Sequence, residues 1–494
     1  MLFNSIDFLL FFPAVIGIYF LFPFKYRWLF LLAASYLFYG VANGWFLLII
    51  ILSTLIDYLV GLKMSQFAEK ERRKPFLYIS LVSNLGTLII FKYFNFFNDS
   101  FGDLFYLLNL DYAIPALNVI LPVGISFYTF QTLAYSIDIY NGRAEAEKHF
   151  GFFALYVTYF PQLVAGPIER SRSLIPQLKS KTTLTYDNTT NGLKLMVWGF
   201  FKKVVIADQI APMIRFVTDS PEDFYGISVL LCAVLFSYQV YCDFSGYSDI
   251  AIGAAQILGV KLMVNFKQPF SAKRLSEFWA RWHISLTTWF KDYVYKEWGG
   301  GGKNLIKSYQ GLFLVFFLSG LWHGANYTFL LWGTLNGLLI IVYAKFRSQI
   351  SRLYKFFGLG KKTSLKGAVQ VFFTVIVFSS FGILFFSNNL SQAATLYFNL
   401  SQKWPSTLSN IAFNENGSRL HDLYLGYNMF QFLGVILSLI FMEYIQNIQK
   451  QTGSFRQFWD TKGPILRWFG YVSVVMLVIL YSFDRETPFV YFQF

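Results

Sequence analysis

Long apolar stretches alternate with short polar ones along the chain. They lie near residues 5–24, 28–41, 45–62, 76–97, 118–140, 150–168, 191–217, 226–260, 311–343, 367–387, 427–448 and 464–483. Many of them approach the length of about 20 residues with which an α-helix crosses a bilayer. The pattern predicts an all-α polytopic membrane protein with roughly 11 spans plus re-entrant or short helices. Because no long polar segment could fold separately, residues 1–494 are expected to form one transmembrane domain.

The charges between the apolar segments predict which loops face the cytoplasm. The loops at 63–74 and 345–366 are rich in lysine and arginine, which is typical of cytoplasmic loops. The loop at 98–118 carries three aspartates and no basic residue, and the loop at 219–223 is also acidic. Both acidic loops, and with them both termini, are therefore expected on the opposite side of the membrane. Lys202 and Lys203 interrupt the segment 191–217, so no crossing is assigned there.

The apolar segment 311–343 conflicts with a single crossing. The polar region 261–307 before it and the region after 345 are both basic, which predicts that its two ends lie on the same side. Either two short helices enter and leave, or the segment is re-entrant with a break near 320–324. Irregular backbone at membrane depth is tolerated only where protein or a water-filled cavity surrounds it. We therefore expect His323, beside this break, to line a cavity.

The composition supports a membrane protein and excludes several other classes. The residues are 55% hydrophobic, 21% aromatic and 14% charged, and the net charge of +14 fits basic cytoplasmic loops better than nucleic-acid binding. Cys232 and Cys242 lie in one apolar stretch, so they indicate neither a disulfide framework nor a metal site. Residues 1–24 lack a basic start and a small-residue cleavage site, which predicts a retained first span instead of a signal peptide.

His323 is the first candidate for chemistry. The chain has four histidines, and no other is so deeply embedded in apolar sequence. An ionisable ring in a bilayer is costly and is by default a functional-site hypothesis. Imidazole titrates near neutrality, so it can take and return a proton during acyl transfer. The alternative is a packed histidine bonded to a neighbouring helix.

A second candidate lies in the segment 275–290. As one helix, this segment places four residues on one side: Trp279, His283, Leu286 and Phe290. The pattern predicts an interfacial helix with His283 on or near its apolar face. The alternative is a membrane-surface helix whose histidine has no function.

Charged residues near these segments have more than one interpretation. Three cations, Lys273, Arg274 and Arg281, could hold the phosphates of an acyl-thioester carrier or face anionic lipid headgroups. Asp243 and Asp249 lie in an apolar stretch and need a partner there. They could orient a histidine, line the cavity or pack helices together.

Two further motifs are interpreted as structural. The glycine run at 299–303 fails the phosphate-loop pattern, because Asn304 stands where Ser or Thr is needed, and it is predicted to be a flexible turn. The Glu169-Arg170 pair follows a helix end at Gly166 and Pro167 and is also predicted to be structural.

Several of these motifs together resemble the membrane-bound O-acyltransferase family, in its bacterial alginate O-acetylase branch. The similarity covers nearly the whole chain and includes the motifs at 1–5, 166–170, 243–249, 281–283, 321–324 and 489–494. It implies a funnel-shaped multi-helix membrane fold with a thin central floor. It also implies that His323 is the signature histidine of the family and that His283 is the second histidine, on the cytoplasmic side.

The resemblance implies acetyl delivery across the bacterial inner membrane, for O-acetylation of an exported polysaccharide alongside periplasmic partner proteins. The expected acyl source is a cytoplasmic thioester such as acetyl-CoA, acting as a co-substrate, with no bound cofactor or metal. His323 would act as general base or relay a proton, and His283 would position the donor. The acceptor would be the polysaccharide or a hydroxyl on a partner protein. The candidate substrate-binding residues are Trp279, Arg281, Trp282, Trp322, Asn326 and Asp243.

Two departures and two rival functions accompany this interpretation. The turn at 298–303 and the serine that follows Phe385-Phe386 both differ from the family pattern, which leaves the acceptor or partner open. The first rival is transfer of another acyl group, such as D-alanine to teichoic acid. The second is a proton-coupled transporter, which ranks lower because no second copy of the 311–343 pattern is found.

Overall fold

The protein is helical throughout its described part. The computed structural model describes residues 1–41, 44–356, 364–405, 423–452, 455–482 and 489–490, and no strand occurs among them. Within these ranges, eight helices are long and apolar enough to cross a membrane. Other apolar segments form shorter helices, such as α1 (Ile6–Leu21) with 16 residues. The predicted all-α membrane fold is thus confirmed.

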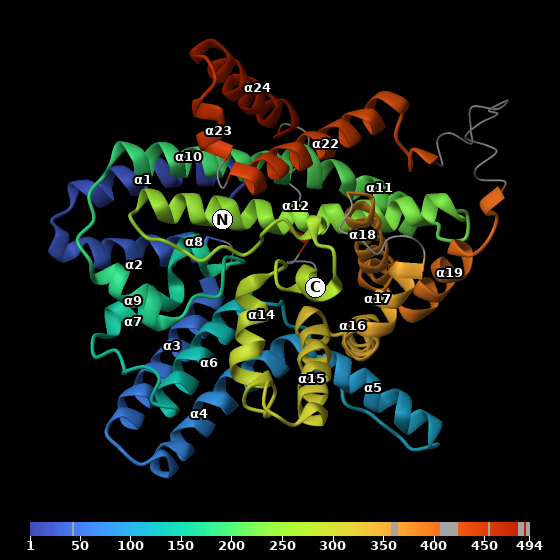
Figure 1. Ribbon diagram of the computed structural model, residues 1–494. Helices are drawn as coiled ribbons and strands as arrows, with labels where there is room; N and C mark the ends of the chain where they lie inside the picture. Colours follow the sequence, from blue (N-terminus) through green and yellow to red (C-terminus); the bar gives the residue numbers. More distant parts are fainter. Residues whose placement is uncertain (42–43, 357–363, 406–422, 453–454, 483–488, 491–494) are drawn as a thin grey trace.

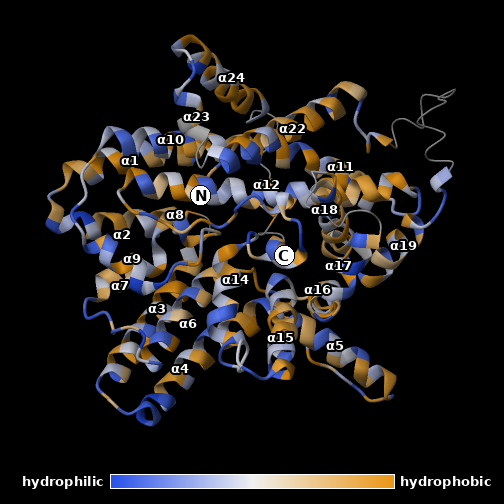
Figure 2. Cartoon of the chain, in the orientation of Figure 1, coloured by the Kyte–Doolittle hydropathy of each residue, from blue (hydrophilic) through white to orange (hydrophobic). Residues whose placement is uncertain are grey.

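Helix α12 (Ile227–Ile257) runs across the middle of the molecule, with α10 (Tyr186–Phe200) beside it (Figure 1). Its most apolar 18-residue window is 72% buried, whereas no residue of α24 (Pro464–Ser482) is buried. Figure 2 shows α24 covered by hydrophobic residues, as expected for a helix that faces lipid. The centre of the protein is therefore built on α12 and its neighbours.

Two buried lysines tie α12 to the preceding π-helix η2 (Phe201–Ala207). The Nζ of Lys203 lies 2.9 Å from Oδ1 of Asp208 and 2.5 Å from Oδ1 of Asp243. The Nζ of Lys202 lies 2.7 Å from Oδ2 of Asp249. Buried charges require such partners, and here each lysine meets an acid of α12. These ion pairs explain how the apolar segment 191–217 can contain two buried lysines.

The residues at 489–490 join the same buried cluster. The backbone N–H of Val490 donates to Oδ2 of Asp243 at 2.6 Å, and the Lys203 ammonium lies 4.4 Å from the ring centroid of Phe489. Phe489 also packs edge-on against Tyr247, which stacks on Phe3. Segments far apart in the sequence therefore meet at one buried site. The predicted motif at 489–494 continues past the described residues.

The segment 311–343 folds as a helical hairpin. Helix α15 (Leu305–His323) and helix α16 (Tyr327–Lys345) pack against each other, with 19 residues in each. A Cβ on Gly320 would lie 2.4 Å from the Phe329 carbonyl oxygen, so glycine is needed for this close approach. The break falls just after His323, within the region 320–324 where it was predicted.

The prediction of one interfacial helix over 275–290 is wrong. The segment forms two short helices, α13 (Leu275–Trp279) and α14 (Ile284–Phe290), and His283 between them has a left-handed backbone with φ of 44°. The chain is bent here by backbone hydrogen bonds to the loop 265–268, from Lys267 to the Arg281 carbonyl and from Ile284 to the Asn265 carbonyl. His283 is buried, with 2% of its surface exposed, so its ring lies inside the protein and not on an exposed helix face.

Candidate active site

His323 is the last residue of α15 and is enclosed by aromatic rings from three helices. Its ring centroid lies 5.0 Å from that of Trp322, 5.2 Å from that of Trp332 on α16 and 5.0 Å from that of Phe385 on α18 (Ser364–Phe386). Only 6% of His323 is exposed. The enclosure fixes the orientation of the imidazole and keeps bulk water away from it.

His323 lines a small, partly open cavity, as the sequence predicted. The cavity has a volume of about 40 Å³, which is room for a few water molecules. Its wall combines Trp322 and His323 with Lys92, Val164 and the segment 121–127. A reacting group in this cavity would lie beside the imidazole.

His283 also packs against the Trp322 ring. The Trp322 centroid is 5.6 Å from that of His283 and 5.0 Å from that of His323. The His283 ring also packs edge-on against Phe244, at 4.6 Å. Burial lowers the pKa of His283 well below its usual value, and charge on His323 would lower it further. Burial therefore favours the neutral form of this imidazole.

Asn265 holds the start of α14, and with it His283. This side chain is fully buried, and its Oδ1 accepts hydrogen bonds from the Ser285 N–H at 3.1 Å and from the Ser285 hydroxyl at 2.9 Å. Its backbone carbonyl accepts from the Ile284 N–H at 2.8 Å. Sequence reasoning missed Asn265. The signal available was an amide residue inside the apolar run 262–266.

Replacing Asn265 with alanine should lower both stability and activity. The substitution leaves the Ser285 N–H and hydroxyl buried without their acceptor, at a cost of about 1–3 kcal/mol for each group. We expect a lower melting temperature of the purified protein, measured in detergent by intrinsic fluorescence. Asn265→Asp keeps an acceptor oxygen, so its melting temperature should fall less than that of Asn265→Ala. Equal melting temperatures for wild type and Asn265→Ala would contradict this role.

The three predicted tryptophans gather around the two histidines. Trp322 contacts both histidine rings, and Trp279 packs at 5.8 Å on Trp332, which itself contacts His323. Trp282 lies 5.2 Å from Phe266, whose ring stacks 6.5 Å from that of His283. Aromatic rings therefore connect Trp279 and Trp282 to the two histidines.

The other three predicted binding residues make structural contacts. Arg281 pairs with Glu277 at 2.5 Å and donates to the Ser271 hydroxyl at 2.7 Å. Asn326 caps α16 by accepting from the Thr328 N–H, and it donates to the carbonyl of residue 388. Asp243 binds Lys203 and the Val490 N–H instead of a histidine. For Asp243 the structure therefore favours the helix-packing alternative.

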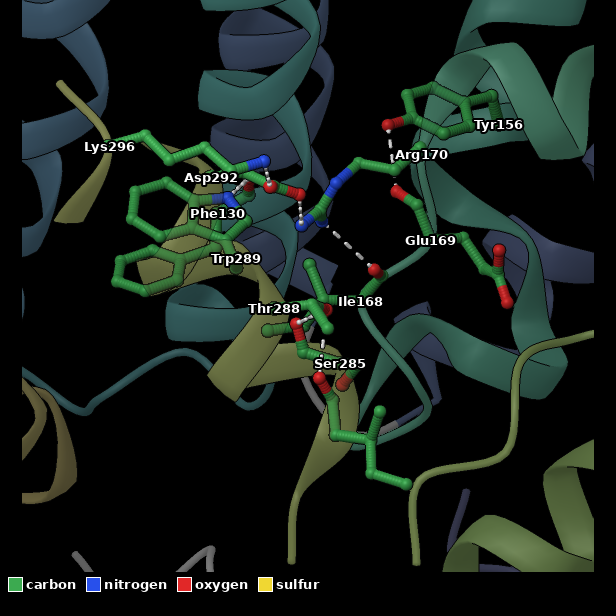
Figure 3. Close-up of polar contacts among 11 residues, drawn as sticks. Phe130, Tyr156, Ile168, Glu169, Arg170, Ser285, Thr288, Trp289, Asp292 and Lys296 are labelled. Carbon is green, nitrogen blue, oxygen red and sulfur yellow. Dashed lines mark hydrogen bonds and ion pairs between the residues drawn. The ribbon is translucent and has the colours of Figure 1, made fainter. Parts of the chain in front are cut away.

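The Glu169-Arg170 pair is structural, but its members do not bind each other. Figure 3 shows the two side chains pointing in different directions. Arg170 donates to the Ile168 carbonyl at 3.2 Å and reaches Asp292 at 4.0 Å (Figure 3). Glu169 accepts from the Met263 N–H at 2.5 Å. Each residue thus ties its loop to a different part of the protein.

Glu169 should give the protein a pH-dependent stability. Burial raises its pKa from 4.5 to about 7, while the hydrogen bond from Met263 opposes the shift. Because the folded state holds the proton more tightly, this stabilisation is complete below the unfolded pKa and is lost as the pH rises through about 7. We expect the melting temperature to fall between pH 5 and pH 8 in the wild type, and to fall less in Glu169→Gln. Equal changes in melting temperature with pH for the wild type and Glu169→Gln would contradict the role of Glu169 in this pH dependence.

Comparison with known proteins identifies the family. The model of the membrane-bound O-acyltransferase family matches residues 146–387, which include both histidines. A Pseudomonas putida protein named probable alginate O-acetylase is 34% identical, over 100% of both chains. A Helicobacter pylori peptidoglycan O-acetyltransferase is 35% identical over 66% of each chain. A Bacillus subtilis teichoic acid D-alanyltransferase is 30% identical, over 55% of this chain and 70% of its own length. The chain belongs to the membrane-bound O-acyltransferase family.

Proposed function

We propose that this O-acyltransferase moves an acetyl group from a cytoplasmic thioester to an exported cell-surface polysaccharide, with His323 as general base. The observation that carries the proposal is the position of His323, at the tip of a membrane hairpin and on the wall of a small, partly open cavity. The relatives that act on alginate and peptidoglycan support an acetyl group and a polymer acceptor.

The arrangement of the two histidines supports transfer from one membrane face towards the other. Helix α14 leads from His283 through η4 (Lys291–Tyr295) to Glu297, which pairs with Arg143 near the basic loop 63–74. The opposite end of the site, at the hairpin tip, contacts Ser100 through Tyr327. Ser100 belongs to the acidic loop 98–118, which is expected outside the cytoplasm. His283 thus lies towards the basic side and His323 towards the acidic side.

In the proposed step, His323 is the one residue that takes up and returns a proton. His323 removes the proton from an acceptor hydroxyl as its oxygen attacks the thioester carbonyl carbon. The new C–O bond forms, the C–S bond breaks, and the leaving thiolate takes the proton back from the imidazolium. A well-placed general base contributes roughly 10²–10⁴-fold to the rate. His283, which packs against Trp322, would position the donor on the cytoplasmic side.

Several finer features belong to the same proposal. The donor would be a soluble co-substrate such as acetyl-CoA, and residues 1–494 would act as one domain in the bacterial inner membrane. Periplasmic proteins would carry the group onward or present the polymer, and a hydroxyl of such a partner could be the immediate acceptor. Trp279, Trp282 and Trp322 would line the donor route, because they connect the two histidines to the surrounding rings.

A second candidate is transfer of a D-alanyl group to a cell-wall polymer. It is favoured by the similarity to the Bacillus subtilis D-alanyltransferase, which covers a smaller share of this chain than the acetylase match does. The two functions are distinguished by which acid, acetate or D-alanine, is released when the ester on the polymer is hydrolysed. Cell-surface polymer from strains with and without the gene would be treated with mild alkali, and the products identified by mass spectrometry. Gene-dependent acetate supports the proposal, whereas gene-dependent D-alanine replaces it with the alternative.

A further inference from the structure

The carboxyl end of α15 is capped by two adjacent side chains of another helix. The chain from Lys70 to Leu107 is continuous and contains a π-helical turn, η1 (Ile89–Tyr93). The Nζ of Lys92 on this turn donates to the Trp322 carbonyl at 2.7 Å and to the His323 carbonyl at 3.2 Å. The hydroxyl of Tyr93 donates to the Leu321 carbonyl at 2.8 Å.

These contacts satisfy carbonyls that α15 itself cannot use. The last carbonyls of a helix have no intrahelical partner. A glycine in the left-handed conformation often closes the end, but Gly324 is extended, with φ of −165° and ψ of 155°. Lys92 and Tyr93 supply the missing donors from outside the helix. The backbone of His323 is therefore fixed by the π-turn and not by its own hairpin.

Lys92 also faces the cavity that contains His323. The residue is partly buried, and the cavity wall includes both side chains. A lysine inside a membrane span is costly and marks a functional position by default. Among the described carboxylates, none forms a salt bridge with Lys92, and its amino group donates to the two hairpin carbonyls. A cation at a helix carboxyl end is electrostatically favourable, which helps to retain the amino group there.

We propose that Lys92 is a positioning residue for the acyl-transfer reaction, holding His323 at the cavity wall through the terminal carbonyls of α15. This inference rests on the proposed role of His323. Displacing a catalytic group by about 1 Å can lower a rate on the order of 10²-fold. Lys92→Met retains most of the side-chain volume but removes the donor, so the imidazole would lose its fixed position while the cavity stays filled.

The experiment compares four variants in cells: Lys92→Met, Lys92→Arg, Tyr93→Phe and His323→Ala. The initial rate of acetyl-ester appearance on the cell-surface polymer is measured after induction and divided by the membrane abundance of each protein. Melting temperatures of the purified proteins are measured in parallel. We expect Lys92→Met to lose on the order of 10²-fold in rate at wild-type abundance. Lys92→Arg, which keeps a cationic donor, should recover at least a third of the wild-type rate.

The remaining outcomes separate this inference from the proposed function. Tyr93→Phe is the matched control, because it removes one cap from Leu321 but leaves both bonds of Lys92; we expect a loss below fivefold. Full activity of His323→Ala would overturn the proposed role of His323 as general base, on which this inference rests. Inactive His323→Ala with fully active Lys92→Met would overturn only the positioning role. A loss equal in Lys92→Met and Lys92→Arg that tracks falling abundance or melting temperature would also overturn it, and leave Lys92 a structural cap.

Discussion

Cells that carry His323→Ala should add almost no ester to their surface polymer. His323 is the only histidine among the residues that line the cavity. Histidine is the side chain that most often acts as a general base. Its loss should lower the rate by roughly 10²–10⁴-fold. The measurement is ester content per unit of membrane protein, with the abundance of each variant determined by immunoblotting.

A matched histidine serves as the control for this experiment. His149 caps α7 (Phe150–Thr158) and packs on Trp28, away from both candidate histidines. His149→Ala should weaken only a helix cap, and ester content at equal abundance should stay near the wild-type value. Unchanged ester in His323→Ala would return His323 to the role of a packed histidine. Loss in His149→Ala as well would show that the assay reports folding instead of chemistry.

His283→Asn should lower acyl transfer on the order of 10²-fold, without unfolding the protein. His283 has a left-handed backbone, a conformation that asparagine tolerates better than most residues. His283→Ala removes the ring and also strains the backbone by about 1–2 kcal/mol. The two variants therefore separate the function of the imidazole from that of the turn.

The corresponding measurement is the initial rate of ester formation together with the melting temperature of each variant. We expect both variants to be slow, but only His283→Ala to melt at a clearly lower temperature. An active His283→Asn would show that position 283 matters for its backbone alone. The donor-positioning role of His283 would then be lost from the proposal, while the role of His323 would stand.

The hairpin at 305–345 could be predicted because its cause is local. Charge on the flanking loops required both ends to lie on one side, and this constraint is visible in the sequence. The position of the break was also visible, since Gly324 and Asn326 favour helix ends. The loop residues Lys361 and Lys362, which contributed to the charge argument, lie outside the described residues.

The bend at His283 could not be predicted in the same way. The helical periodicity over 275–290 is a genuine local pattern. It is overridden by the hydrogen bonds that Asn265 accepts from Ile284 and Ser285 and by the one that Lys267 donates to the Arg281 carbonyl. Such hydrogen bonds depend on which loop packs against the segment, and a single sequence does not show that the loop 265–268 packs there. The helix prediction failed because a tertiary contact determined the backbone.

The candidate site was predicted unevenly for a related reason. His323 and Trp322 could be predicted because a histidine in a deeply apolar segment is unusual. Arg281 and Asn326 instead form an ion pair and a hydrogen bond with residues nearby in the chain, and the sequence pattern does not reveal these contacts. Lys92 was missed because its partners are more than 200 residues away. Its only signal was one lysine inside the apolar run 76–97.

The contact between Val490 and Asp243 has a consequence for biogenesis. Asp243 is inserted with α12, long before residue 490 leaves the ribosome, so its carboxylate receives that backbone donor only late in synthesis. Translation stalled or ended before residue 489 would leave the charged cluster incomplete inside the bilayer. The charged cluster on α12 is therefore completed only by a segment that is made 247 residues later in the chain.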